Sequence, residues 1–160
     1  MLAVHLTVAV GWIGSVITFL VVVVVAMRSD DGDLRSAWTA LDWMADFAIV
    51  PLALLAFVSG IVLAVGTPWG LFRHYWVTIS LALTTVAVAV LLSNVQTVDH
   101  YAALARRGEL GSLRDGLRTE LVHAGAGLCV LLVVQVLNLY KPRGLTRYGL
   151  RKQAATASVS

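Results

Sequence analysis

The sequence has little charge and almost no sulfur. Only 13% of its 160 residues are Asp, Glu, Lys or Arg, which is about half the share in a typical soluble domain. The single cysteine, Cys129, excludes an internal disulfide. The chain also has only three methionines, so it offers too few soft ligands for Cu(I) transport. These shortages argue against a disulfide-stabilised domain and against a thiolate copper carrier.

Familiar catalytic motifs are also missing. The chain has no phosphate-binding loop, no His-Glu-x-x-His helix and no recognisable Ser/His/Asp arrangement. The net charge is only +3, which favours anionic lipid headgroups as partners and gives no indication of nucleic-acid binding. We therefore expect an integral membrane protein that serves as a structural or partner-binding subunit. An enzyme is the less favoured interpretation.

What the chain does have is long apolar runs. Hydrophobic residues make up 59% of it and the mean hydropathy is +0.84. The runs predict an all-α fold, a four-transmembrane-helix up-down bundle in the lipid bilayer. We expect one membrane domain over 1–152, a disordered tail over 153–160, and spans at about 2–27, 43–65, 75–98 and 121–140.

Two polar stretches between the spans carry further signals. Leucines recur at helical spacing at 110, 113, 117 and 121, which predicts a short amphipathic surface helix before the fourth span. Residues 28–35 are expected to form a polar loop. Asp46 would then lie in the first turn of the second span, where a helix N-terminus favours a carboxylate. The alternative interpretation of Asp46 is a buried functional acid.

The first span carries two stripes that a lipid-facing helix does not need. His5 and Trp12 share one face, and the small residues Gly11 and Gly14 form a second stripe beside it. Small-residue stripes let transmembrane helices approach closely. They predict packing against a neighbouring helix, a homo-oligomer or a membrane partner.

Four histidines suggest a different function. In an up-down bundle His5 and His74 open two spans at one membrane level, while His100 and His123 lie toward the other face. Imidazoles on facing helices can hold a haem iron from both sides. The alternative function is therefore a b-type haem protein that uses His5 with His74, or His123 instead.

Neighbouring residues add to this haem hypothesis. Trp12 could stack on a macrocycle, and Arg73 could meet a propionate of haem b. The same three histidines, at 5, 74 and 123, are the metal-ligand candidates if the protein is a metal-handling membrane domain. A structural role for each histidine remains open, since imidazoles at membrane interfaces often make ordinary hydrogen bonds.

Several strings carry a family resemblance. They are His5 with residues 11–14, the Gly-Thr-Pro-Trp-Gly-Leu-Phe-Arg-His-Tyr-Trp segment 66–76, the His-Ala-Gly of 123–125, and Lys-Pro-Arg-Gly-Leu-Thr-Arg-Tyr-Gly at 141–149. They resemble a family of small bacterial integral membrane proteins of unknown function, over nearly the whole chain. The resemblance implies a multi-pass protein of the bacterial plasma membrane and supplies no activity.

A more distant resemblance concerns the opening histidine, the Trp-x-Gly and the aromatic start of the third span. These are similar to the copper-resistance D-type membrane domain and to the four-helix haem-associated protoporphyrinogen oxidase. Both tend to have Trp-x-x-x-Lys in that span, whereas Ser80 stands at the lysine position after Trp76 here. The departure argues against protoporphyrinogen chemistry and is compatible with haem binding.

The membrane orientation is nearly balanced in the sequence. Arg73 and five basic residues of the tail lie on the side of the termini, against six arginines in the opposite loops. The positive-inside rule therefore ties. We expect both termini in the cytoplasm.

Overall fold

The protein is a bundle of long helices. The computed structural model describes residues 1–67, 69–142 and 144–157. The elements are α1 (Leu2–Ala26), α2 (Asp31–Met44), the π-helical turn η1 (Ala45–Ile49), α3 (Val50–Val65), α4 (Tyr75–Arg107), α5 (Leu113–Tyr140) and α6 (Arg147–Ala157). No β-strand is present in these ranges.

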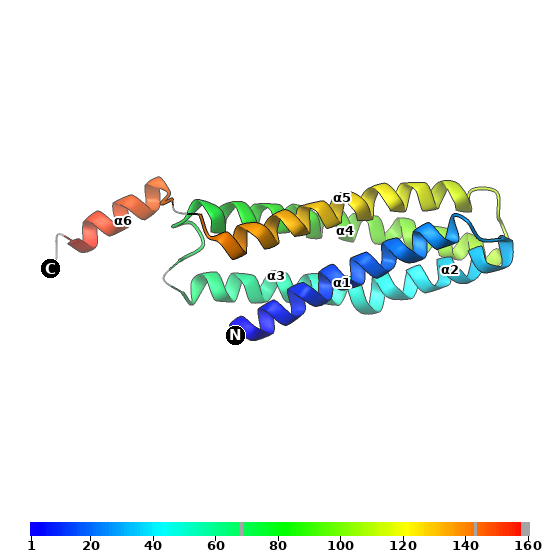
Figure 1. Ribbon diagram of the computed structural model, residues 1–160, viewed down its shortest axis with the longest axis horizontal. Helices are drawn as coiled ribbons and strands as arrows, with labels where there is room; N and C mark the ends of the chain where they lie inside the picture. Colours follow the sequence, from blue (N-terminus) through cyan, green and yellow to red (C-terminus); the bar gives the residue numbers. More distant parts are fainter. Residues whose placement is uncertain (68, 143, 158–160) are drawn as a thin grey trace.

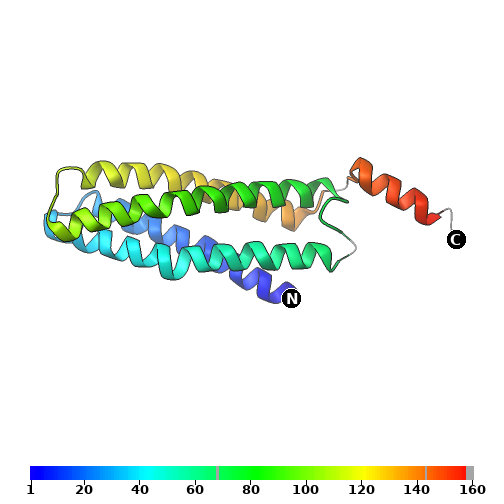
Figure 2. The same ribbon diagram turned by 180° about the vertical axis from the view of Figure 1, so that it is seen from behind.

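The described residues form four long helical rods. These rods lie side by side and alternate in direction, with both termini at the same end (Figures 1 and 2). α2, η1 and α3 form one of these rods without interruption. α1 packs against α3 and α5, and α4 packs against the same two helices. Each rod is long and apolar enough to cross a membrane. The predicted four-helix membrane bundle is confirmed.

The second rod begins earlier than the sequence suggested, at Asp31 rather than near 43. Asp30 caps it, because the Asp30 carboxylate accepts hydrogen bonds from the backbone N–H groups of Gly32 and Asp33, each at 3.1 Å. Most of the expected loop 28–35 is therefore helical. Asp46 lies in the first turn of η1, but η1 continues α2 without a break, so Asp46 is inside a continuous helix and caps no helix N-terminus.

The third and fourth rods are also longer than predicted. α4 continues to Arg107, and α5 begins at Leu113, so the connection between them is short. The predicted amphipathic segment is helical, but it is continuous with the fourth span. Leu113 and Leu117 are fully buried in the bundle. They do not face a membrane surface.

These extensions form a compact end of the bundle, which we call the head: residues 31–44, 99–107 and 113–120. The second rod has 35 residues and measures about 52 Å at 1.5 Å per residue. A hydrocarbon core is only about 30 Å thick. The head therefore lies beyond the hydrocarbon, which is why its helices can carry so many charged side chains.

Trp38 is the centre of the head and has no exposed surface. Its indole Nε1–H donates to the carbonyl oxygen of Leu113 at 3.3 Å, and its ring stacks on Tyr101 with centroids 5.0 Å apart. Gly116 lies under both rings. A Cβ there would be 2.8 Å from Trp38 and 2.8 Å from Tyr101, so the contact requires glycine.

The small-residue stripe on α1 is divided between two environments. A Cβ at Gly11 would touch the Leu52 side chain at 3.6 Å, whereas a Cβ at Gly14 would meet nothing within 4 Å. Gly14 and Thr18 are exposed. Gly14 therefore does not pack inside the bundle, and the stripe faces outward at this point.

The end opposite the head carries the C-terminal segment. After α5 the chain turns at Lys141, which has a left-handed backbone (φ 43°), and α6 extends away from the bundle (Figure 1). Residues 153–157, expected to be disordered, continue α6. Residues 158–160 lie outside the described part of the chain.

Candidate functional site

A cavity of about 440 Å³ opens between α1, α3, α4 and α5 at the end where the termini lie. Part of its wall is made of small residues, which leave the volume of the cavity unfilled. They are Ala9, Ala56, Gly60 and Ala64. Most of the wall is apolar. The polar residues along it are His5, Thr67, Ser80, Thr84, Gln135, Asn138 and Lys141. An apolar pocket of this size with a few polar groups is typical of a ligand or cofactor site.

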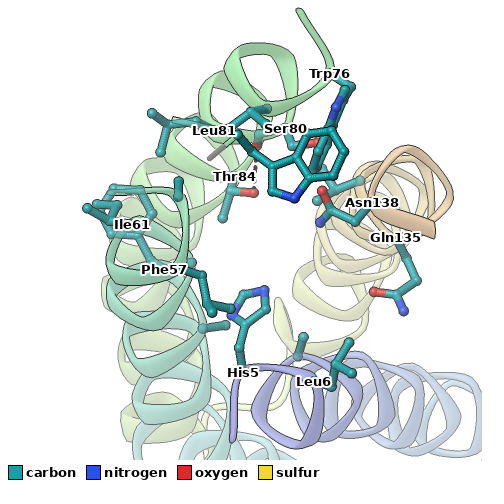
Figure 3. Close-up of a pocket in the computed structure, with 18 of the residues that line it drawn as sticks. His5, Leu6, Phe57, Ile61, Trp76, Ser80, Leu81, Thr84, Gln135 and Asn138 are labelled. Atoms are coloured by element: carbon teal, nitrogen blue, oxygen red, sulfur yellow. Dashed lines mark hydrogen bonds between the residues drawn. The ribbon is translucent and has the colours of Figure 1, made fainter. Parts of the chain in front are cut away.

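His5 of α1 faces Ser80 and Thr84 of α4 across the cavity (Figure 3). Its Nδ1 lies 2.9 Å from Ser59 Oγ. The Ser59 hydroxyl itself donates to helix carbonyl oxygens, that of Leu55 at 2.6 Å and that of Ala56 at 3.2 Å. Since a hydroxyl has one proton, Ser59 Oγ accepts from His5 Nδ1–H. This assignment leaves the lone pair on His5 Nε2.

Gly60 makes room for the imidazole. A Cβ at this position would be 3.2 Å from His5 Cε1, a distance that would force the ring to move. The glycine and the neighbouring Ser59 thus fix both the position and the tautomer of His5. Metal-ligating histidines are commonly held in this way, through a hydrogen bond from the nitrogen that does not ligate.

Aromatic and hydroxyl groups complete the walls. Trp12 is 4% exposed and lines the cavity on the same helix as His5. On α4, Trp76 and Ser80 are both buried, and Trp76 Nε1 and Ser80 Oγ make no hydrogen bond within the described residues. Two polar atoms without a partner therefore lie in the wall opposite His5.

His74 and Arg73 are not among the residues that line the cavity. His74 directly precedes α4, and its Nδ1 lies 2.8 Å from the carbonyl oxygen of Trp69. The Arg73 carbonyl oxygen accepts from the backbone N–H of Thr146 at 3.0 Å. Among the described residues, Lys141 is a cation that lines the cavity, and its Nζ lies 5.7 Å from the centroid of the Trp69 ring.

The other two histidines are remote from the cavity. His123 is exposed on α5, and its Nδ1 lies 3.1 Å from the carbonyl oxygen of Thr119. His100 is exposed in the head and contacts Tyr101 edge-on. His5 is thus the one histidine among the described residues that line the cavity.

Sequence reasoning singled out Asp46 but missed the cluster of carboxylates to which it belongs, at the edge of the head. Asp42, Asp46 and Asp99 each place an oxygen within 4.8 Å of the others. Arg106 Nη1 donates to Asp42 Oδ2 at 2.9 Å. The sequence feature that could have indicated this cluster is the spacing of Asp42 and Asp46, because residues four apart lie on one face of a helix. The cluster became visible only when α2 and α4 proved long enough to bring Asp99 beside them.

Glu120 is a second acid that the sequence did not single out. It is 1% exposed on α5, and its Oε2 accepts from Asn94 Nδ2 at 2.8 Å. Its Oε1 has no hydrogen-bond partner among the described residues.

Comparison of the chain with models of protein families, with curated proteins and with solved structures finds no match. The resemblances noted from the sequence therefore stay predictions. Any assignment of function depends on the cavity and the residues that line it.

Proposed function

We propose that the protein is a membrane-embedded cofactor-binding protein, and that its cavity holds a haem b through His5. The observation that carries the proposal is the contact of His5 Nδ1 with Ser59 Oγ at 2.9 Å in the wall of the cavity. Ser59 holds Nδ1–H, so the Nε2 lone pair is available as an axial ligand beside an apolar cavity.

The other residues of the cavity fit such a group. Its volume of about 440 Å³ lies within the range of cofactor sites. Trp12 lies in the wall for contact with a macrocycle, and Lys141 supplies a cation for a propionate. A bound haem would supply one-electron redox chemistry, for which the chain would provide ligation, burial and orientation.

This proposal differs from a site made by two histidines. His74 is engaged with Trp69, and His123 is at a distance along α5, so neither joins His5 in the cavity. A haem in this cavity would therefore be held by one histidine of the protein, His5. The wall opposite His5 offers the weaker polar groups Ser80 and Thr84.

The experiment is a titration of haem into the detergent-purified protein, followed by the Soret absorption. We expect a saturable shift for the wild type and none for His5→Ala. His100→Ala serves as the matched control and should bind haem like the wild type, because His100 is outside the cavity. A wild-type protein without any saturable Soret shift would overturn the cofactor proposal.

A second candidate function is that of a packing subunit. It is favoured by Gly14, which is exposed on α1 and has open space around its Cβ position. Such a surface accepts a close helix from another protein or a second copy. Gly14→Leu should then abolish an oligomer seen by light scattering in detergent and leave the thermal stability of the protomer unchanged. An unaltered oligomeric state in Gly14→Leu would remove this candidate.

A further inference from the structure

The chain after α5 is fastened to the start of α4. Thr146 donates to the carbonyl oxygen of Phe72 through Oγ1 at 2.5 Å and to that of Arg73 through its backbone N–H at 3.0 Å. The Tyr75 N–H donates to the carbonyl oxygen of Gly144 at 3.3 Å. A short antiparallel bridge pairs residues 74 and 145. We call this contact the clasp: residues 144–149 against residues 72–75.

The clasp fixes where α6 begins. Gly149 packs so closely on Arg73 that a Cβ would overlap its carbonyl oxygen. Trp69 and Trp76 lie beside this region with ring centroids 5.7 Å apart, and tryptophan is typical of the level of lipid headgroups. α6 therefore starts at the membrane–water interface and projects from the bundle (Figure 1).

The charge of this region is of one sign. The sequence after Glu120 contains no Asp or Glu, and five Lys or Arg residues follow Tyr140. On α6, Arg147 and Arg151 are exposed and lie one helical turn apart. Tyr148 and Leu150 beside them are 58% and 55% exposed. Basic and apolar side chains are thus presented together at an interface.

The basic residues of the head are in a different situation. Arg106 pairs with Asp42 at 2.9 Å, Arg114 with Asp31 at 3.5 Å, and Arg118 with Asp115 at 3.2 Å. All nine acids of the chain lie between residues 30 and 120. The head therefore neutralises much of its own positive charge, whereas the segment after Tyr140 contains no acid that could do so.

We propose that α6 binds the anionic phospholipid headgroups of the leaflet on the side of the termini. Arg147 and Arg151 meet the phosphates, and Leu150 enters the interface. A membrane whose cytoplasmic leaflet is anionic attracts a basic segment next to a span. The proposal places both termini in the cytoplasm, and it does not depend on haem binding.

The test uses the full chain with Cys129→Ser and Leu150→Cys, labelled at residue 150 with a polarity-sensitive fluorophore. The protein is reconstituted into nanodiscs of phosphatidylcholine alone or of equimolar phosphatidylcholine and phosphatidylglycerol. We expect a blue shift of the emission in the anionic discs only. The shift should be reversed by high salt, which screens exposed charges.

Two charge variants make the test specific. Arg147→Gln with Arg151→Gln should lose the blue shift. Arg28→Gln with Arg107→Gln removes the same charge from exposed positions at the end of the bundle that carries the head, and this variant should keep the blue shift. Equal emission of the wild type in both kinds of disc would overturn the proposal. A full shift in the Arg147/Arg151 variant would also overturn it.

Discussion

Ser59 Oγ accepts a hydrogen bond from His5 Nδ1–H at 2.9 Å while its own proton is donated to the carbonyl oxygen of Leu55 at 2.6 Å. The two residues are 54 positions apart in the sequence and belong to α1 and α3. Because the hydroxyl proton of Ser59 is used in the hydrogen bond to the helix carbonyl, the hydroxyl oxygen is left as an oriented acceptor for the imidazole. The proton of His5 is thereby assigned to one nitrogen, and the other is left for a ligand.

Ser59→Ala removes this acceptor and leaves the ring free to rotate and change tautomer. We expect the affinity for haem to fall about 10- to 100-fold, the usual effect of losing a partner that orients a metal ligand. The measurement is the dissociation constant from the Soret titration. Thr18→Ala is the control, because the Thr18 hydroxyl also donates to a carbonyl oxygen of its own helix but is exposed and away from the cavity. Equal affinities of the two variants would contradict the role given to Ser59.

Gly116→Ala should destabilise the head. The added Cβ would be 2.8 Å from both Trp38 and Tyr101, and overpacking of this kind costs about 1–3 kcal/mol. The higher helix propensity of alanine offsets roughly 1 kcal/mol of that cost at most. Thermal unfolding in detergent should therefore show a lower Tm than for the wild type.

The matched control for this prediction is Gly125→Ala on the same helix. A Cβ there meets nothing within 4 Å, so only the gain in helix propensity remains, and the Tm should be unchanged or higher. If both variants shift the Tm in the same direction by a similar amount, the close packing of Gly116 under Trp38 is wrong.

Arg106→Gln leaves three neighbouring carboxylates without their cation. Asp42 is 12% exposed in its side chain and Arg106 is 53% exposed. We expect a loss of about 1–2 kcal/mol, below the 3–5 kcal/mol found when one partner of a fully buried pair is removed. The loss should be larger at pH 7 than at pH 5, because the hydrogen bond with Asp42 raises the pKa of Asp99, and protonation of Asp99 at lower pH reduces the repulsion. Chemical unfolding at both pH values measures it.

Arg118→Gln is the control for the Arg106 variant. Arg118 and its partner Asp115 are 73% and 74% exposed, and ion pairs at such positions contribute little. A stability loss in Arg118→Gln as large as that in Arg106→Gln would show that the acidic cluster has no special need of a cation.

The four spans could be predicted from the sequence because hydrocarbon selects for charge-free runs, and these are visible in the order of residues. The head could not. Its helices lie in water and carry charged residues such as Asp31 and Asp99. The hydropathy of these segments is therefore similar to that of loops. Their length became clear only from tertiary contacts such as that of Trp38 with Leu113.

The candidate site was predictable in part for a similar reason. Helical periodicity placed His5 and Trp12 on one face of α1, and both line the cavity. Membrane level alone suggested His74, but level does not determine side-chain direction, and the His74 ring is engaged with Trp69. The place of Lys141 in the cavity wall could not be predicted. It depends on a left-handed backbone at that residue, directly after α5, and a lysine in the sequence does not indicate such a conformation.

The central claim is that His5 is the single strong axial ligand, and the spin state of the haem complex tests it most directly. Electron paramagnetic resonance of the reconstituted ferric protein should show a high-spin signal, because one histidine leaves the sixth position without a strong ligand. The signal should persist in His74→Ala and His123→Ala and be lost in His5→Ala. A low-spin wild-type signal that disappears in His74→Ala or His123→Ala would contradict the account.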